Sequence, residues 1–185
     1  MTEYDVPFDT WWFRLPRRPE EQRATLRPRI GKGRFAVVIP REGYYQIGYL
    51  APKGADARLR TAGVEAFRAD IADLMPEYAD RVDEIASMDE VKHLDVKLNR
   101  LRRWHVDGLL CIGDAAHAMT PNLGQGANQA MEDAATLTAL VRRHGRGDLD
   151  EALRTYDRLR RPRTQRIVRQ AVAVFGFVEM IIGHR

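Results

Sequence analysis

The stretch that decides the fold is Gly113–Asn128, which reads GDAAHAMTPNLGQGAN. It follows Leu109–Ile112, a continuous apolar run typical of a strand buried on both faces. Pro121 interrupts the segment after the strand, and Gly124 and Gly126 open a predicted helix. This order of strand, loop and helix predicts an α/β unit, in which ligands bind beyond the carboxyl ends of the strands.

The residue types in this stretch suit a polyhydroxylated ligand that carries an anionic acceptor group. Asp114 comes directly after the predicted strand, where its carboxylate can accept hydrogen bonds from hydroxyl groups. The glycines lack side chains, so the backbone can approach a flat ligand closely. The free N–H groups of Gly126, Ala127 and Asn128 would form a positive helix end, which favours a full or partial negative charge.

The same run resembles the second flavin-binding motif of the para-hydroxybenzoate hydroxylase-like, single-component FAD monooxygenases. That motif reads Gly-Asp-Ala-Ala-His, a short spacer, Pro, then Gly-x-Gly-x-Asn and an Asp-Ala pair, and this chain has every part. Trp104 before the strand, and Tyr156 followed by Arg160-Arg161-Pro162, are similar to further features of the family. The resemblance covers residues 104–166 and extends more loosely upstream.

The resemblance implies FAD as cofactor and gives the motif residues their roles. Asp114 would bind the ribityl chain, and the loop around Pro121 would lie beside the isoalloxazine. The start of the helix would face the pyrimidine edge of the flavin, where reduction places negative charge. The implied cofactor-binding set is Gly113, Asp114, Pro121, Gly124, Gln125, Gly126, Ala127 and Asn128. Since the flavin supplies the chemistry, we assign no catalytic side chain.

The function that the resemblance implies is the FAD-binding portion of a monooxygenase that uses NAD(P)H and O₂ to hydroxylate a small aromatic or polyketide-like substrate. A second flavoenzyme hypothesis comes from Trp11–Pro16, which loosely resembles the Trp-x-Trp-x-Ile-Pro of flavin-dependent halogenases. A reductase-like relative is another alternative. From a different class, the chain could be a non-catalytic remnant or interaction module, since an apolar tail at 171–183 would suit a partner interface.

Such flavoenzymes begin with a strand, Gly-x-Gly-x-x-Gly and a helix, which hold the FAD pyrophosphate. The nearest match here, Gly31–Ala36, has Pro28 before it and a predicted strand after it. We therefore expect a mixed α/β, Rossmann-like FAD/NAD(P)-binding flavoprotein fold whose N-terminal βαβ unit is absent, with a sheet subdomain on the substrate side. The chain resembles the C-terminal half of such an enzyme, and alone it should bind FAD weakly or not at all.

Hydrophobic periodicity predicts the remaining elements. Strands are expected at 11–15, 35–39, 44–50 and 91–98, with a loop or short helix at 17–29. The last strand would place Leu94, Val96 and Leu98 on one face. Helices are expected at 59–75, 76–85, 126–143 and 149–161, with a kink or interruption at Pro162. The predicted division is a substrate-side sheet at 1–103, the C-terminal part of the FAD-binding domain at 104–170 and an apolar helix at 171–185.

Four residues are candidates for the wall of a substrate pocket. Trp12 and Arg14 share one face of the first predicted strand, and Tyr44 and Gln46 lie on the following hairpin. Arg14 could pair with a carboxylate. Ordinary packing within the sheet is the alternative role for all four.

Composition narrows the class of protein. The chain has 185 residues, 44% of them hydrophobic, which excludes a disordered chain, and its one cysteine excludes a disulfide scaffold. No apolar run reaches the roughly 18–20 residues of a membrane span, and the N-terminus lacks the apolar core of a signal peptide. We expect a cytoplasmic protein with no membrane partner.

The charge of the chain adds little to the functional prediction. The formal net charge is +4, and two arginine clusters, at 100–103 and 158–166, come without a recognition motif, so we expect no nucleic-acid partner. The five histidines are scattered without the spacing of metal ligands, so we expect no metal. The expected partners are a small organic substrate, O₂, and either a second copy of the chain or a missing N-terminal half.

Overall fold

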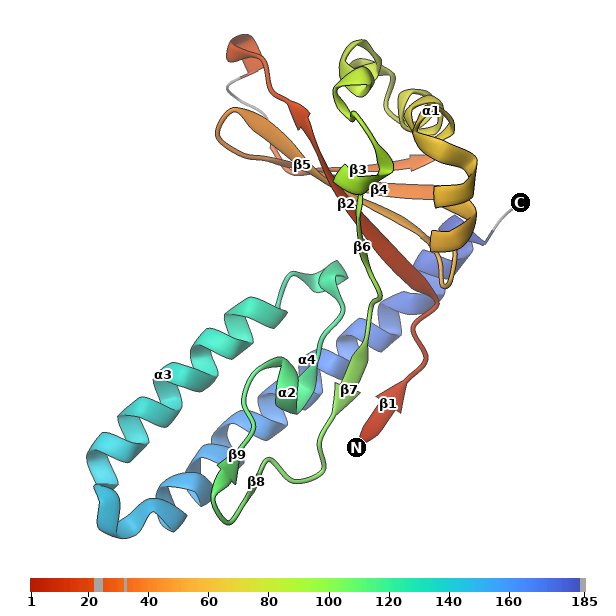
Figure 1. Cartoon of the computed structure of the whole chain (residues 1–185). Helices are drawn as coiled ribbons and strands as arrows, with labels where there is room; N and C mark the ends of the chain where they lie inside the picture. The colour runs from red at the N-terminus through yellow and green to blue at the C-terminus, as the bar shows by residue number, and fades with distance from the viewer. Residues whose placement is uncertain (22–24, 32, 184–185) are drawn as a thin grey trace. The chain divides into compact units, whose positions relative to one another are not determined.

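The computed structural model in Figure 1 describes residues 1–21, 25–31 and 33–183. These residues form two compact units, each described here by itself. The sheet unit comprises Pro7–Val96 and Gly176–Arg185, and the motif unit comprises Met1–Val6 and Lys97–Phe175.

The sheet unit is built on five antiparallel strands in the order β3-β4-β5-β2-β6. Their bounds are β2 Phe8–Pro16, β3 Arg27–Gly31, β4 Arg34–Pro40, β5 Tyr44–Pro52 and β6 Lys92–Leu94. A short 3-10 helix, Pro19–Glu21, follows β2. Between β5 and β6 the chain forms α1, Asp56–Leu74, and two 3-10 helices, Pro76–Glu84 and Met88–Glu90.

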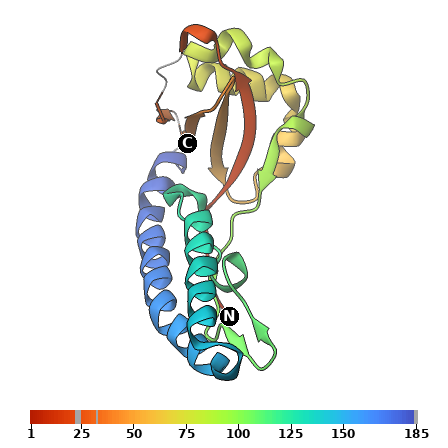
Figure 2. The ribbon, with the colours of Figure 1, turned by 90° about the vertical axis from the view of Figure 1, so that its left-hand side faces the viewer.

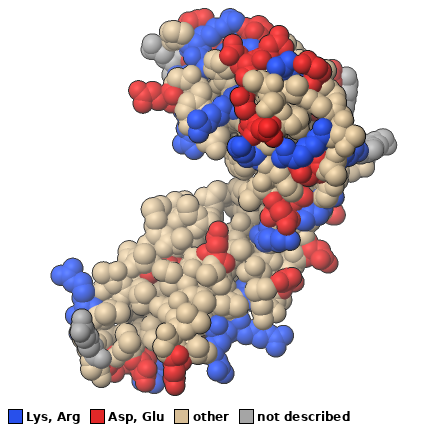
Figure 3. Space-filling view, in the orientation of Figure 1, with Lys and Arg blue, Asp and Glu red and all other residues tan. Residues whose placement is uncertain are grey.

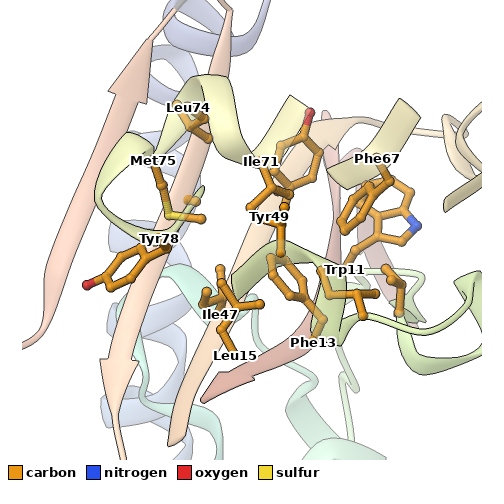
Figure 4. Close-up of a cluster of buried hydrophobic side chains, with 14 of the residues drawn as sticks. Trp11, Phe13, Leu15, Ile47, Tyr49, Phe67, Ile71, Leu74, Met75 and Tyr78 are labelled. Atoms are coloured by element: carbon orange, nitrogen blue, oxygen red, sulfur yellow. The ribbon is translucent and has the colours of Figure 1, made fainter. Parts of the chain in front are cut away.

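Alternation along the strands decides which face of this sheet carries the core. Trp11, Phe13 and Leu15 of β2 are buried on one face, where they pack with Ile47 of β5. On this face α1 contributes the buried side chains Phe67, Ile71 and Leu74, as Figure 4 shows. The other face holds the alternate residues of β2 and β5, which remain partly or fully exposed near the Pro16 end of β2.

The motif unit contains two short strand pairs and two long helices. β1, Thr2–Tyr4, pairs with β7, Leu98–Arg100, and β8, His105–Val106, pairs with β9, Leu109–Leu110. The helices are α2 Asp114–His117, α3 Gly126–His144 and α4 Leu149–Ile182, with 3-10 turns at Pro121–Leu123 and Arg146–Asp148. Figures 1 and 2 show α3 lying beside the first part of α4, and the last turns of α4 belong to the sheet unit.

Several predicted elements match the structure closely. The helices expected at 59–75 and 126–143 are α1 and α3, and the segment at 76–85 is helical with 3-10 geometry. The near match to a dinucleotide fingerprint at 31–36 falls on the β3–β4 hairpin. A strand and no helix follows it, as predicted, so it does not form the dinucleotide-binding turn; Lys32 lies outside the described residues.

The predicted strand at 109–112, buried on both faces, is wrong. β9 has only two residues, and Leu109 is 60% exposed. The reason is that β9 forms a hairpin ladder with β8, and no other described strand pairs with it.

The single strand expected at 91–98 is also wrong. It is divided into β6 and β7, and Leu94 is exposed while Val96 and Leu98 are buried. At the break, distant side chains take the hydrogen bonds that a ladder would provide. The N–H of Val96 donates to Oδ1 of Asp9 at 3.0 Å, and its carbonyl accepts from Nζ of Lys53 at 2.7 Å.

Pro162 does not end or divide the helix that contains it. α4 continues from Leu149 to Ile182, so the predicted interruption is wrong. Pro162 lacks an N–H donor, so α4 has one backbone hydrogen bond fewer there; the buried residues Tyr156 and Val168 lie before and after it along the helix. Upstream, the segment at 17–29 was expected to lack a strand, whereas β3 begins at Arg27; Pro28 is tolerated there because β3 is an edge strand.

Candidate functional site

Gly113 sets the start of the predicted site. Its backbone has φ +57°, a conformation that favours glycine. A Cβ there would lie only 3.1 Å from Cβ of Ala130, so a residue without a side chain lets the turn pack closely against α3. The next residue, Asp114, begins α2 with its side chain exposed.

The N-terminus of α3 is the second part of the site. Gly124 adopts the left-handed conformation, φ +60°, that turns the chain into α3. The residue before the helix, Gln125, makes no side-chain cap to its first turn. No side-chain cap from Gln125 therefore competes with a ligand acceptor for the first-turn amides.

The structure brings these two parts together. A Cβ added to Gly126 would lie 3.9 Å from Oδ1 of Asp114, so the carboxylate stands beside the first residue of α3. The predicted set of Gly113, Asp114 and Gly124–Asn128 therefore lies within one unit and around one helix end. Pro121 begins the 3-10 turn that links α2 to this end.

A buried polar network, which sequence reasoning did not assign to the site, holds the turn in place. Asp133 is fully buried in α3, and its Oδ2 accepts the N–H of Gly113 at 3.0 Å and lies 2.7 Å from Nε2 of His117. Its Oδ1 accepts Nε of Arg160 from α4 at 2.8 Å. Burial by itself would raise the pKa of Asp133, but the hydrogen bonds with His117, Arg160 and Gly113 outweigh it and hold that pKa below its ordinary value.

Aromatic side chains cover this network. The ring of Trp104 lies 5.1 Å from that of His117 and 5.8 Å from that of Tyr156. Burial, and then the charge of Asp133, raises the pKa of Tyr156 well above its ordinary value, so the phenol stays neutral. These residues, with Arg160, are among those that carried the resemblance in the sequence. Their presence in the motif was the available signal, and their mutual contact was not visible in it.

The four predicted substrate residues share the open face of the sheet unit. Arg14 pairs in register with Gln46, and Pro16 with Tyr44, so all of them point away from the core. The guanidinium of Arg14 lies 4.7 Å from the ring centre of Tyr44, a cation–π distance.

Trp12 lies on the same face, over β5. Its indole lies so close to Gly48 that a Cβ there would come within 2.9 Å of the ring and force the indole to shift. A pocket of about 390 Å³ opens beside it. Its lining comprises Trp12, Phe13, Arg14, Gln46, Ile85, Asp89, Glu90 and Lys92.

The described part of the chain contains no group of three or more His, Cys, Asp or Glu side chains placed to hold a metal ion. None of its helices combines the length and the apolar character needed to cross a membrane.

Comparison with known proteins gives a consistent family. A family model described as FAD binding domain matches residues 1–171. Among curated proteins, 6-methylpretetramide 4-monooxygenase of Streptomyces rimosus is 39% identical over 130 residues, which are 69% of this chain and 31% of that protein. The FAD-dependent monooxygenase janM of Penicillium janthinellum is 39% identical over 82 residues, 40% of this chain and 17% of that protein.

Solved structures share the fold. PqsL, described as a probable FAD-dependent monooxygenase from Pseudomonas aeruginosa, superposes with a TM-score of 0.79 at 23% identity, over 97% of this chain and 50% of that chain. Klebsiella pneumoniae HpxO, solved with FAD and uric acid, gives a TM-score of 0.70 at 21% identity, over 98% and 46%. The mixed α/β, FAD/NAD(P)-binding flavoprotein fold expected from the sequence is thus confirmed.

The chain spans about a third or less of the curated relatives and about half of the solved chains that it matches. The match over residues 1–171 nevertheless extends through almost the whole chain. The chain therefore belongs to the FAD binding domain family.

Proposed function

We propose that the chain is the C-terminal, flavin-ring portion of a para-hydroxybenzoate hydroxylase-like monooxygenase that uses NAD(P)H and O₂ to hydroxylate a small aromatic or polyketide-like substrate. The observation that carries this proposal is the exposed carboxylate of Asp114 beside the uncapped N-terminus of α3. We keep as a proposal the functional division expected from the sequence: a substrate-side sheet at 1–103, a flavin-binding part at 104–170 and a terminal helix at 171–185.

The residues present fit the cofactor. Asp114 offers acceptors to the hydroxyl groups of a ribityl chain, and its side chain is free to turn outward because it is exposed. The amides of Gly126, Ala127 and Asn128 would face the pyrimidine edge of the ring, where they favour negative charge. Pro121 and Gly124 would shape the loop beside the ring. When bound, the flavin would supply the redox and oxygen-transfer chemistry.

The open sheet face is the proposed substrate wall. Trp12 offers a flat apolar surface, Gln46 a neutral polar group, and Arg14 a guanidinium that no described carboxylate pairs with. Small ring compounds fit this chemistry. The names of the relatives agree with it: one is a 6-methylpretetramide monooxygenase, and PqsL was solved with 2-aminobenzoylacetate.

The remaining half of the flavin site is proposed to come from sequence beyond these 185 residues, on the same or another polypeptide. Exposed residues of α3 offer a surface on which it could pack, because they carry no charge from Ala127 to Thr138. They are Ala127, Asn128, Met131, Ala134, Ala135 and Thr138. Figure 3 shows a largely uncharged area over α3. A second copy of the chain is the alternative proposed partner. We also propose a cytoplasmic location for the protein.

The proposal is tested by mixing the purified chain with FAD and following flavin fluorescence, with and without a separately produced Gly-x-Gly-x-x-Gly half from a relative. We expect weak or no binding by the chain alone and clear binding by the mixture.

Asp114→Ala should weaken binding by the mixture about tenfold, as expected for hydrogen bonds to a charged acceptor. Asp107→Ala, an exposed aspartate of the same unit, is the control. Stoichiometric FAD on the isolated chain, or no effect of Asp114→Ala, would contradict the proposal.

A further inference from the structure

The shared carboxylate of Asp133 joins three separate segments of the motif unit. The N–H of Gly113 and Nε2 of His117 both meet its Oδ2, at 3.0 and 2.7 Å. Arg160 meets its Oδ1 from α4. Asp133, His117 and Arg160 are buried, and so is Gly113, so the three contacts are made out of reach of solvent.

Arg160 supplies the charge that makes a buried carboxylate tolerable. Its Nη2 donates to the carbonyl and to Oε1 of Gln129, at 3.2 and 2.8 Å, and its Nη1 donates to Glu132 at 2.5 Å. The guanidinium is therefore fixed by α3 on several sides at once. A buried ion pair held by so many hydrogen bonds favours one arrangement, because any shift leaves a charge unpaired.

What this arrangement fixes is α2. That helix has four residues, too few to keep its shape alone. Gly113 lies just before it and His117 ends it, and the N–H groups of Ala116 and His117 donate to the carbonyl of Gly113 at 2.9 Å each. Asp133 thus holds both ends of the turn that presents Asp114.

We propose that Asp133 is the positioning residue of the flavin site: it fixes Asp114 relative to the N-terminus of α3 before any cofactor binds. Asp133 itself lies two turns into the same helix, so the carboxylate that would bind the ribityl chain and the amides that would face the ring are held by one rigid element. The role toward the flavin rests on the proposed function, whereas the ordering of α2 does not.

Hydrogen exchange of the whole chain tests the ordering directly. Asp133→Asn cannot accept from Gly113, bind His117 and pair with Arg160 at once, so the amides of Gly113 and His117 should exchange about tenfold faster or more. The matched control is Glu132→Gln, which also removes a carboxylate partner of Arg160 but touches neither Gly113 nor His117. Its loop amides should exchange within about twofold of the wild-type rate. His117→Gln, which keeps a donor toward Asp133, should restore most of the protection that His117→Ala loses.

Three outcomes would overturn the inference: unchanged exchange in Asp133→Asn, equal acceleration in Glu132→Gln, or acceleration no greater than that of the whole unit. If Asp133→Asn does not fold, Arg160→Lys serves as the second variant. It keeps the positive charge but loses the several donors of the guanidinium, so exchange of the same amides should be faster. A parallel FAD titration with the complementing half separates the two proposals. Loosening of α2 without any FAD binding by the wild type would refute the proposed function alone, and FAD affinity unchanged by a loosened α2 would refute the positioning role.

Discussion

Asp9 shows how a single buried carboxylate can organise a strand end. It is 2% exposed, and it is bonded to Nζ of Lys53 at 2.7 Å and to the N–H groups of Gly54 and Val96. His93 lies 3.3 Å from its second oxygen. Burial would raise the pKa of Asp9, but these partners outweigh it and hold the pKa below its ordinary value.

This lowered pKa gives a prediction about acid stability. A carboxyl group with a lowered folded-state pKa stabilises the fold above its unfolded pKa and loses that effect as the pH falls through the folded value. Asp9→Asn should therefore reduce the free energy of unfolding at pH 7 by about 1–3 kcal/mol. Between about pH 5 and 3, the free energy of unfolding should also fall less steeply in the variant than in the wild type. Urea unfolding at several pH values measures both effects.

The control for this experiment is Asp5→Asn, because Asp5 is exposed and should leave the profile unchanged. An Asp9→Asn profile parallel to that of the wild type would show that the carboxylate plays no such part.

At the scale of elements, two glycines inside helices should respond in opposite ways to the same substitution. Gly176 of α4 is exposed, and a Cβ there would meet nothing within 4 Å. Gly63 lies within α1 at φ +84°, where an L side chain is strained. Gly176→Ala should raise the free energy of unfolding by about 0.5–1 kcal/mol, and Gly63→Ala should lower it by about 1–3 kcal/mol. Thermal unfolding of the pair measures this; a gain in both variants would contradict the assigned backbone at Gly63.

Helices governed by their own periodicity could be predicted from the sequence, and elements governed by distant partners could not. α1 and α3 follow from apolar spacing within each segment. The division of residues 91–98 into two strands depends on Asp9 and Lys53, which are remote in sequence. α4 likewise continues through Pro162, although the local rule for proline predicts an interruption there.

The candidate site divides along the same line. Asp114, Gly124 and Gly126 could be predicted as site residues because one short stretch contains them all. Asp133 and Arg160 lie 27 positions apart and meet only in the folded unit, so no local sequence pattern predicts their contact.

At the scale of the whole molecule, each unit has its own buried cluster and its own tryptophan reporters. Trp11 and Trp12 belong to the sheet unit, and Trp104 belongs to the motif unit. Ile71 is fully buried within the sheet unit, in the cluster of Figure 4. Ile71→Ala should therefore cost about 2–5 kcal/mol through loss of burial and a residual cavity.

Single-reporter variants, with either Trp104 or the Trp11–Trp12 pair replaced by phenylalanine, show where this loss is felt. We expect Ile71→Ala to lower the urea midpoint reported by Trp11 and Trp12 more than that reported by Trp104. Equal shifts at both reporters would instead mean that the two units unfold as one cooperative body.

The sharing of Asp133 among α2, α3 and α4 bears on protein engineering. A designer who transplants only the sixteen residues 113–128 into another scaffold would carry over the ligand-facing groups without the carboxylate and guanidinium beneath them. The smallest portable piece is discontinuous: the turn, two further turns of α3 and the Arg160 segment of α4. Directed-evolution libraries for this protein should therefore vary these positions jointly, since a change at one position leaves a charged group at another without its partner.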